Sequence, residues 1–148
     1  MNAEIRGYKP QVLMQLVNLP KERFRYWRAH LDPNPHRSHF TFSDIFAYRI
    51  MKSFIDDRRE EVAFLAGLDW STLFTKLANT SYKELRKMVI VLDSQPAKMT
   101  IEYLDKANYI LSNKVSILYL APLVDEQFSS FVELGSQNVV SIKKAKKA

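Results

Sequence analysis

The 148-residue chain has no cysteine and only three glycines. Without cysteine it cannot form disulfide bonds, bind zinc through thiolates or use a thiolate nucleophile. It also lacks a glycine-rich phosphate-binding loop. The carboxylate pairs at 56–57 and 60–61 flank two arginines, as on a solvated helix face, and His30, His36 and His39 have no carboxylate at a metal-binding spacing. We therefore expect no enzymatic activity, metal or cofactor.

Long apolar runs are missing as well. No N-terminal run is long enough for a signal peptide, and no segment approaches the length of a membrane span. The sequence therefore predicts a cytoplasmic protein without a membrane partner. With 47% hydrophobic residues, the chain can still bury a substantial core.

The positive charge is concentrated in the N-terminal part of the chain. Residues 1–55 contain nine Lys or Arg against four Asp or Glu, a net charge of +5. Residues 56–142 contain nine against twelve, a net charge of −3, and four lysines follow in the last six residues. A cationic N-terminal part favours nucleic acid as a partner, because phosphate neutralisation supplies most non-specific affinity. We interpret residues 144–148 as a solvated basic tail.

Residues 21–30 are predicted to form a helix with two different faces. Pro20 suits the first turn, and the residue before Pro33 is disfavoured in a helix. The apolar face has a spacing of i, i+3 and i+7, typical of a helix that packs on a core, and consists of Phe24, Trp27 and Leu31. The other face carries Lys21, Arg23, Arg25, Tyr26 and Arg28.

A proline-rich segment follows this helix. Residues 33–39 include His36, Arg37 and His39, and their composition is typical of a turn or wing beside a DNA groove. Residues 40–42 alternate as in a short strand, and Ser43-Asp44 are expected to cap the next helix.

An ordered series of motifs over about residues 8–55 resembles the MerR-type winged helix-turn-helix DNA-binding domain. The series consists of Val12-Leu13-Met14-Gln15-Leu16, Leu19-Pro20, Phe24-Arg25-Tyr26-Trp27, Leu31-x-Pro33 and Phe42-Ser43-x-Ile45. The resemblance implies a scaffold helix at 11–17, a recognition helix at 21–30 and a wing after it. It assigns DNA contacts to Arg25 and Tyr26 in the recognition helix and to Arg37 in the wing.

The expected DNA-binding residues combine this resemblance with the basic face of the helix. Arginine suits the task because its planar fork binds two acceptors of a guanine edge or a phosphate. The complete expected set is Lys21, Arg23, Arg25, Tyr26, Arg28, His36, Arg37 and His39.

Three further helices are predicted in the middle of the chain. The broadest apolar face lies in residues 43–57, where we expect Tyr48 and Arg49 to have ordinary packing and solvent roles. A second helix is expected at 58–68 with Gly67 as its C-cap, and a third at 70–77 with Asp69 as its N-cap.

The C-terminal part is predicted to be a small α+β module. Strands are expected at 88–92, 98–104, 115–120 and 138–142, with a helix from Pro122 to Leu134 that ends at Gly135. An alternative is one amphipathic helix over residues 82–93, because Leu85, Met88, Val89 and Leu92 also fit the helical period. We favour the strand.

Together these patterns predict an α+β protein in four segments. They are a winged helix-turn-helix at 1–57, a helical connector at 58–80, a dimerising α+β module at 81–143, and the tail. We expect a homodimeric regulator of transcription that binds double-stranded DNA at an inverted repeat, because two-fold symmetry matches palindromic half-sites. The alternative is an accessory module that binds another protein through its C-terminal part.

Overall fold

The computed structural model describes residues 7–106 and 115–147, with the backbone alone for residue 106 and residues 136–147. It is a mixed structure of helices and one small antiparallel sheet, which confirms the α+β class. In chain order the elements are α1 (Pro10–Val17), α2 (Lys21–His30), α3 (Phe42–Lys52), a π-helical turn (Ser53–Asp57), α4 (Val62–Leu65), α5 (Trp70–Ala78), α6 (Tyr82–Leu85), β1 (Met88–Ser94), β2 (Ala97–Tyr103), a 3-10 turn (Leu104–Lys106), β3 (Val115–Tyr119) and α7 (Leu120–Lys147).

The two helices expected at the start of the chain are confirmed. Asn18 ends α1 in the left-handed conformation, at φ 56°, and its N–H bonds back to the last turn of the helix. A short turn leads to α2, whose residues 21–30 agree with the prediction. The apolar side chains of both helices, including Leu13, Phe24 and Trp27, are buried in the core.

The strand expected at 40–42 and the cap expected at Ser43-Asp44 were wrong. Phe40 makes a single bridge to Tyr8, and Phe42 already belongs to α3. The N-cap is Thr41, whose hydroxyl accepts from the Asp44 N–H at 3.1 Å, while the Asp44 carboxylate accepts from the Thr41 N–H at 2.8 Å. This reciprocal capping box satisfies two backbone donors and fixes the start of α3.

The helix expected at 58–68 is also mostly wrong. After α3 the chain makes the π-helical turn and then reverses at Arg59, which has a positive φ of 59°. Only residues 62–65 are helical, and α4 ends at Ala66 in a right-handed conformation, so Gly67 is not a left-handed cap. The predicted 70–77 helix is confirmed as α5, and Asp69 caps it through the Thr72 N–H.

The sheet has the order β2-β1-β3, with antiparallel pairing on both sides of β1. The pairs Val89↔Glu102 and Val89↔Tyr119 show the register of the two ladders. This confirms the strands expected at 88–92, 98–104 and 115–120, and rules out the single helix over 82–93, where a short α6 precedes β1.

The end of the chain differs most from the prediction. The strand expected at 138–142 is helical, because α7 continues through Gly135 to residue 147. A glycine inside a helix costs only about 1 kcal/mol relative to alanine, whereas each added residue of an existing helix gains a hydrogen bond. The sheet among the described residues therefore has three strands instead of four.

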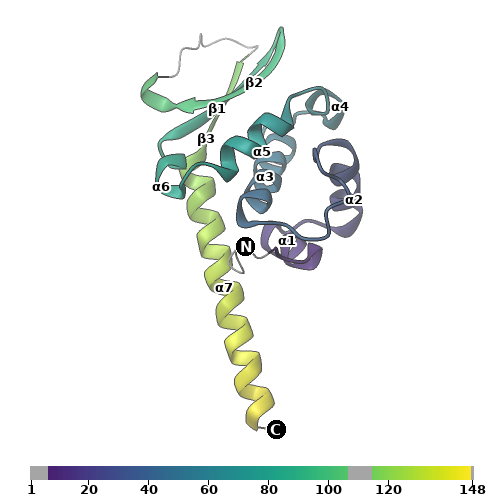
Figure 1. Ribbon diagram of the computed structural model, residues 1–148, viewed down its shortest axis with the longest axis vertical. Coiled ribbons are helices and arrows are strands. Elements are labelled where there is room, and N and C mark those ends of the chain that lie inside the picture. Colours follow the sequence, from purple (N-terminus) through teal and green to yellow (C-terminus); the bar gives the residue numbers. More distant parts are fainter. Residues whose placement is uncertain (1–6, 107–114, 148) are drawn as a thin grey trace.

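A single core joins these elements. It includes Leu13 of α1, Phe46 of α3, Leu73 of α5, Ile90 of β1 and Val124 of α7. Figure 1 shows α7 leaving the sheet, passing the N-terminal helices and extending beyond the rest of the molecule. In the described part of the chain, no helix combines the length and apolar character needed to cross a membrane.

Candidate nucleic-acid interface

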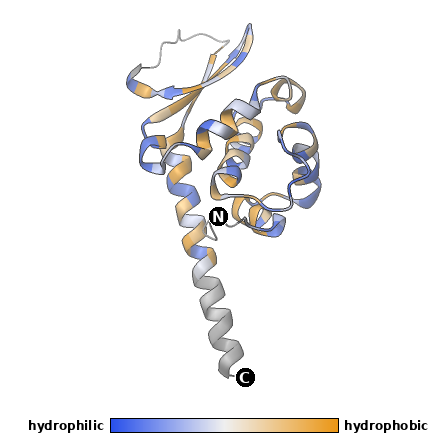
Figure 2. Cartoon of the chain, viewed as in Figure 1, coloured by the Kyte–Doolittle hydropathy of each residue, from blue (hydrophilic) through white to orange (hydrophobic). Residues whose placement is uncertain are grey.

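The structure confirms that α2 has one buried and one exposed face. Phe24 and Trp27 are 3% and 2% exposed. Lys21, Arg25 and Tyr26 lie on the outer side of the helix and are exposed, with Tyr26 at 52%. Figure 2 shows this outer side as predominantly hydrophilic. The helix therefore presents two cationic side chains and an aromatic ring to a partner.

The ring of Tyr26 is supported by the next turn of α2. Its centroid lies 4.3 Å from that of His30, four residues later on the same face. His30 is itself exposed. This contact limits the freedom of the tyrosine, so less conformational entropy is lost when the ring meets a ligand.

Arg23 lies at the edge of this face and already has a partner. Its two terminal nitrogens bind the two carboxylate oxygens of Asp56, one of them at 3.2 Å, and its guanidinium lies 4.7 Å from the centre of the Trp27 ring. Hydrogen bonds from Arg23 hold the pKa of Asp56 below its usual value. Both side chains are about a third exposed, and such surface pairs contribute little stability, so a phosphate can compete for the arginine.

Arg28 points toward the 33–39 segment. Its Nε donates to the carbonyl oxygen of Pro35 at 2.6 Å, and Nη2 donates to the carbonyl oxygen of Arg37. The guanidinium also lies 5.4 Å from the centre of the Phe40 ring. Arg28 therefore ties the segment to α2.

Arg37 is enclosed by carboxylates on the inner side of the segment. It binds Asp32 at 2.8 Å and Asp44 at 2.7 Å, and its side chain is only 14% exposed. The fully buried carboxylate of Asp32 also accepts from the Tyr48 hydroxyl at 2.8 Å and from the Asn34 N–H at 2.8 Å. We refer to Asp32, Arg37, Asp44 and Tyr48 as the clamp.

Burial and the negative charge of Asp32 raise the pKa of Tyr48 well above its usual value. The tyrosine therefore stays protonated and continues to donate to the carboxylate. A buried carboxylate needs such donors, because leaving it without partners is costly.

The clamp leaves two histidines on the outer side of the 33–39 segment. His36 and His39 are both exposed, and Nδ1 of His39 lies 3.0 Å from the hydroxyl of Ser38. Gly7 packs so closely against His39 that a side chain at position 7 would collide with the β-carbon of that histidine. The strand-like contact between Tyr8 and Phe40 and this close approach therefore fix the position of the segment.

The eight expected binding residues thus fall into three groups. Lys21, Arg25 and Tyr26 share the exposed face of α2, with Arg23 at its edge. His36 and His39 are exposed on the following segment. Arg28 and Arg37 have intramolecular partners instead.

The sequence reasoning missed the carboxylates Asp32 and Asp56, which occupy two of the arginines. A signal for Asp32 was available, because Asp32, Arg37 and Asp44 lie close together in the chain with opposite charges. No local signal existed for Asp56, which lies 33 residues from Arg23.

Within the described ranges, no group of three or more His, Asp or Glu side chains is placed to hold a metal ion. Comparison of the chain with models of protein families, with curated protein sequences and with solved structures finds no match.

Proposed function

We propose that the protein is a transcription regulator that binds double-stranded DNA in a sequence-specific manner as a homodimer. The observation that carries the proposal is the exposed face of α2. Lys21, Arg25 and Tyr26 lie on it, and none of them pairs with a carboxylate among the described contacts. The opposite face of the helix is buried in the core. A short, rigidly anchored basic helix fits the width of the DNA major groove.

In this proposal the residues have different roles. Arg25 and Tyr26 contact base edges, and Lys21 binds a phosphate. Arg23 also binds a phosphate, after its guanidinium has left the Asp56 carboxylate. His36 and His39 follow the backbone beside the groove, as expected for the wing of a MerR-type domain. Arg28 and Arg37 act indirectly, because their guanidinium groups hold the 33–39 segment in place.

The homodimer is supported by an apolar strip on α7. Phe128 is 45% exposed and Val132, one turn later, is 68% exposed. A helix that extends beyond the molecule with such side chains favours pairing with a second copy. Two-fold symmetry would then present two α2 helices to two half-sites of an inverted repeat.

Selection of bound duplexes from a random DNA pool at near-physiological salt tests the proposal. We expect enrichment of an inverted repeat, and a loss of affinity of about 1–3 kcal/mol when Arg25→Ala removes a bidentate base contact. Arg86 directly follows α6 and pairs with Asp125 of α7, and Arg86→Ala is the control that should leave binding almost unchanged. Uniform weak binding that disappears with added salt would contradict sequence-specific recognition.

A second candidate function is binding of another protein through the sheet. Among the described residues, β2 and β3 each pair on one side only, and Tyr119 on β3 is 49% exposed. Unpaired strand edges can accept a further strand from a partner. This function would gain support if the selection enriched no sequence and a β3 substitution such as Ile117→Pro abolished capture of a specific protein.

A further inference from the structure

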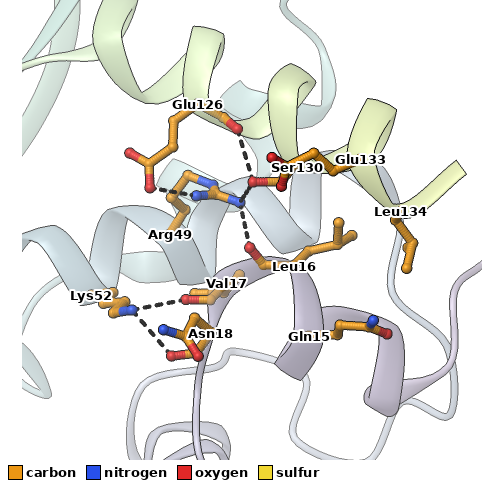
Figure 3. Close-up of a pocket in the computed structure, with 10 residues that line it drawn as sticks. All are labelled: Gln15, Leu16, Val17, Asn18, Arg49, Lys52, Glu126, Ser130, Glu133 and Leu134. Atoms are coloured by element: carbon orange, nitrogen blue, oxygen red, sulfur yellow. Dashed lines mark hydrogen bonds and ion pairs between the residues drawn. The ribbon is translucent and has the colours of Figure 1, made fainter. Parts of the chain in front are cut away.

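A buried arginine lies where α1, α3 and α7 meet. Arg49 of α3 is only 4% exposed, and its nitrogens bind groups of both other helices. Nη2 donates to the Leu16 carbonyl oxygen of α1 at 2.8 Å, while Nη1 donates to Glu126 of α7 at 2.8 Å and Nε to the side-chain oxygen of Gln127 at 3.1 Å. Figure 3 shows the guanidinium between the end of α1 and α7. One planar group therefore links three helices.

The partners of Arg49 are themselves fixed. Gln127 is fully buried, and its amide nitrogen donates to the carbonyl oxygen of Phe42, at the start of α3, at 2.9 Å. Ser130 lies 3.4 Å from Arg49 Nη2, and its hydroxyl donates to the Glu126 carbonyl oxygen at 2.9 Å. We refer to Arg49, Glu126, Gln127 and Ser130 as the junction network. Each of its bonds constrains a direction as well as a distance.

Two pockets that are partly open to the surface border the network. One, of about 330 Å³, lies between the end of α1 and α7 and is bordered by Arg49 and Glu126 (Figure 3). The other, of about 170 Å³, borders the same two residues on the side of Ser53 and Leu123. The ion pair therefore crosses from α3 to α7 between two pockets.

Aromatic contacts also join α7 to α3. The centroid of the Phe42 ring lies 5.3 Å from that of Phe128 and 4.4 Å from that of Phe131. Such contacts hold the helices together, but burial of apolar surface is itself non-directional. The hydrogen bonds of the junction network add constraints on direction.

We propose that the junction network fixes the orientation of α7 relative to the DNA-binding helices α1 to α3, and thereby sets the half-site spacing that the homodimer accepts. The second part rests on the proposed function, whereas the first part does not. Arg49, Glu126 and Gln127 are positioning residues in this mechanism, because none of them contacts the DNA.

The length of α7 makes its orientation matter. A helix of 28 residues spans about 42 Å. A rotation of about 10° at its base displaces its far end by about 7 Å, which corresponds to about two base pairs at 3.4 Å each. Because dimers read half-sites about one helical turn apart, such a displacement is enough to select a different spacing.

The orientation can be measured without DNA. The chain has no cysteine, so Ala29→Cys on α2 and Ser136→Cys on α7 allow selective spin labelling. The distance between the two labels is then measured in the 148-residue chain, diluted with unlabelled chain. We expect a narrow distance distribution, and a broadened or shifted one with Gln127→Leu or Glu126→Gln. Of the two variants, Glu126→Gln should destabilise the fold less, because the Glu126 side chain is 60% exposed.

Asp125→Asn is the matched control. Asp125 adjoins Glu126 on α7 and also pairs with an arginine, but that arginine is Arg86, which directly follows α6 and is not part of the proposed DNA-binding helices. It should leave the distribution unchanged. Identical distributions in the native chain, Glu126→Gln and folded Gln127→Leu would overturn the orientation role.

Binding to inverted repeats with half-sites at different separations tests the second part. We expect Glu126→Gln to change the preferred separation by at least one base pair, or to flatten the preference, while the half-site sequence stays the same. An unchanged separation preference would overturn the role in spacing. If the native protein selected no inverted repeat, the proposed function and the spacing role would both fail, and the distance distributions would decide the orientation role alone.

Discussion

Carboxylates decide which arginines near α2 can reach a ligand. Asp56 forms an ion pair with Arg23 at the surface. Asp32 and Asp44 form ion pairs with Arg37, whose side chain is largely buried. The two situations differ energetically: an exposed pair contributes about 0–1 kcal/mol, while breaking a buried pair leaves an uncompensated charge. Arg23 can therefore exchange its partner for a ligand at low cost, whereas Arg37 cannot.

Asp56→Asn should strengthen the proposed DNA binding. In the native chain Arg23 must leave Asp56 before it binds a phosphate, and the variant removes the cost of breaking this exposed ion pair, about 0–1 kcal/mol. Titrations of DNA binding at a fixed salt concentration measure the gain in affinity. Asp57→Asn removes the same charge from an exposed neighbour that accepts only from the Ser53 hydroxyl among the contacts described, at 3.4 Å, and should give a smaller gain. Equal affinities of the two variants would contradict a role for Arg23.

Tyr48→Phe should destabilise the protein at neutral pH by about 1–3 kcal/mol, because the buried Asp32 carboxylate loses a donor. Folding raises the pKa of Tyr48, so the stabilisation is fully present below the unfolded pKa near 10 and is lost as the pH rises above it. Urea unfolding from pH 7 to 11 should show the difference between the two proteins narrowing above pH 10. A constant difference across this range would exclude the titration of Tyr48 as its cause.

At the scale of elements, caps determine where the helices begin. Thr41 and Asp44 define the start of α3 by a capping box, and Asp69 defines that of α5. At α3 the exact start matters, because it sets the register of a helix in which Asp44, Tyr48 and Arg49 must reach the clamp and the junction network.

Thr41→Ala should lower the free energy of unfolding by about 1 kcal/mol, within a range of about 0.5–2 kcal/mol for lost N-caps. Ser43→Ala, two residues later in the first turn of α3, should cost less than about 0.5 kcal/mol. Urea denaturation of both variants provides the comparison. A larger cost for Ser43→Ala would place the cap at Ser43 after all.

At the scale of the whole molecule, α7 connects the sheet to the N-terminal helices and then leaves them. Its first half contributes Leu120 and Val124 to the core, while Phe128 and Val132 keep much of their surface exposed. In the proposed homodimer, these two exposed side chains would contact the second copy while the core of each copy stays intact.

Val132→Glu should weaken the proposed homodimer about tenfold or more, because it would bury an unpaired charge in the interface. Ser129→Glu, on an exposed position of the same helix outside the apolar strip, should have a smaller effect. Light scattering coupled to size-exclusion chromatography over a range of protein concentrations measures both. Unchanged dimerisation of Val132→Glu would contradict an interface on α7 and would favour one at the edges of the sheet.

The sequence by itself determined the elements whose signals are local. The 3.6-residue spacing of Phe24, Trp27 and Leu31 predicted which face of α2 is buried, and the β-branched run in β1 predicted its strand. The exposed part of the candidate site followed from the same periodicity, because a basic face opposite an apolar one must point to solvent.

Only the tertiary structure decided the rest. Asp56 occupies Arg23 across 33 residues, and Arg49 is buried because α1 and α7 supply acceptors from 33 and 77 residues away. The end of the chain is helical although its valines and isoleucine favour a strand, since strand formation needs a neighbouring strand whereas a helix makes its own hydrogen bonds. Pairings between distant residues leave no periodic pattern in the sequence, and they determine which charges remain free to act.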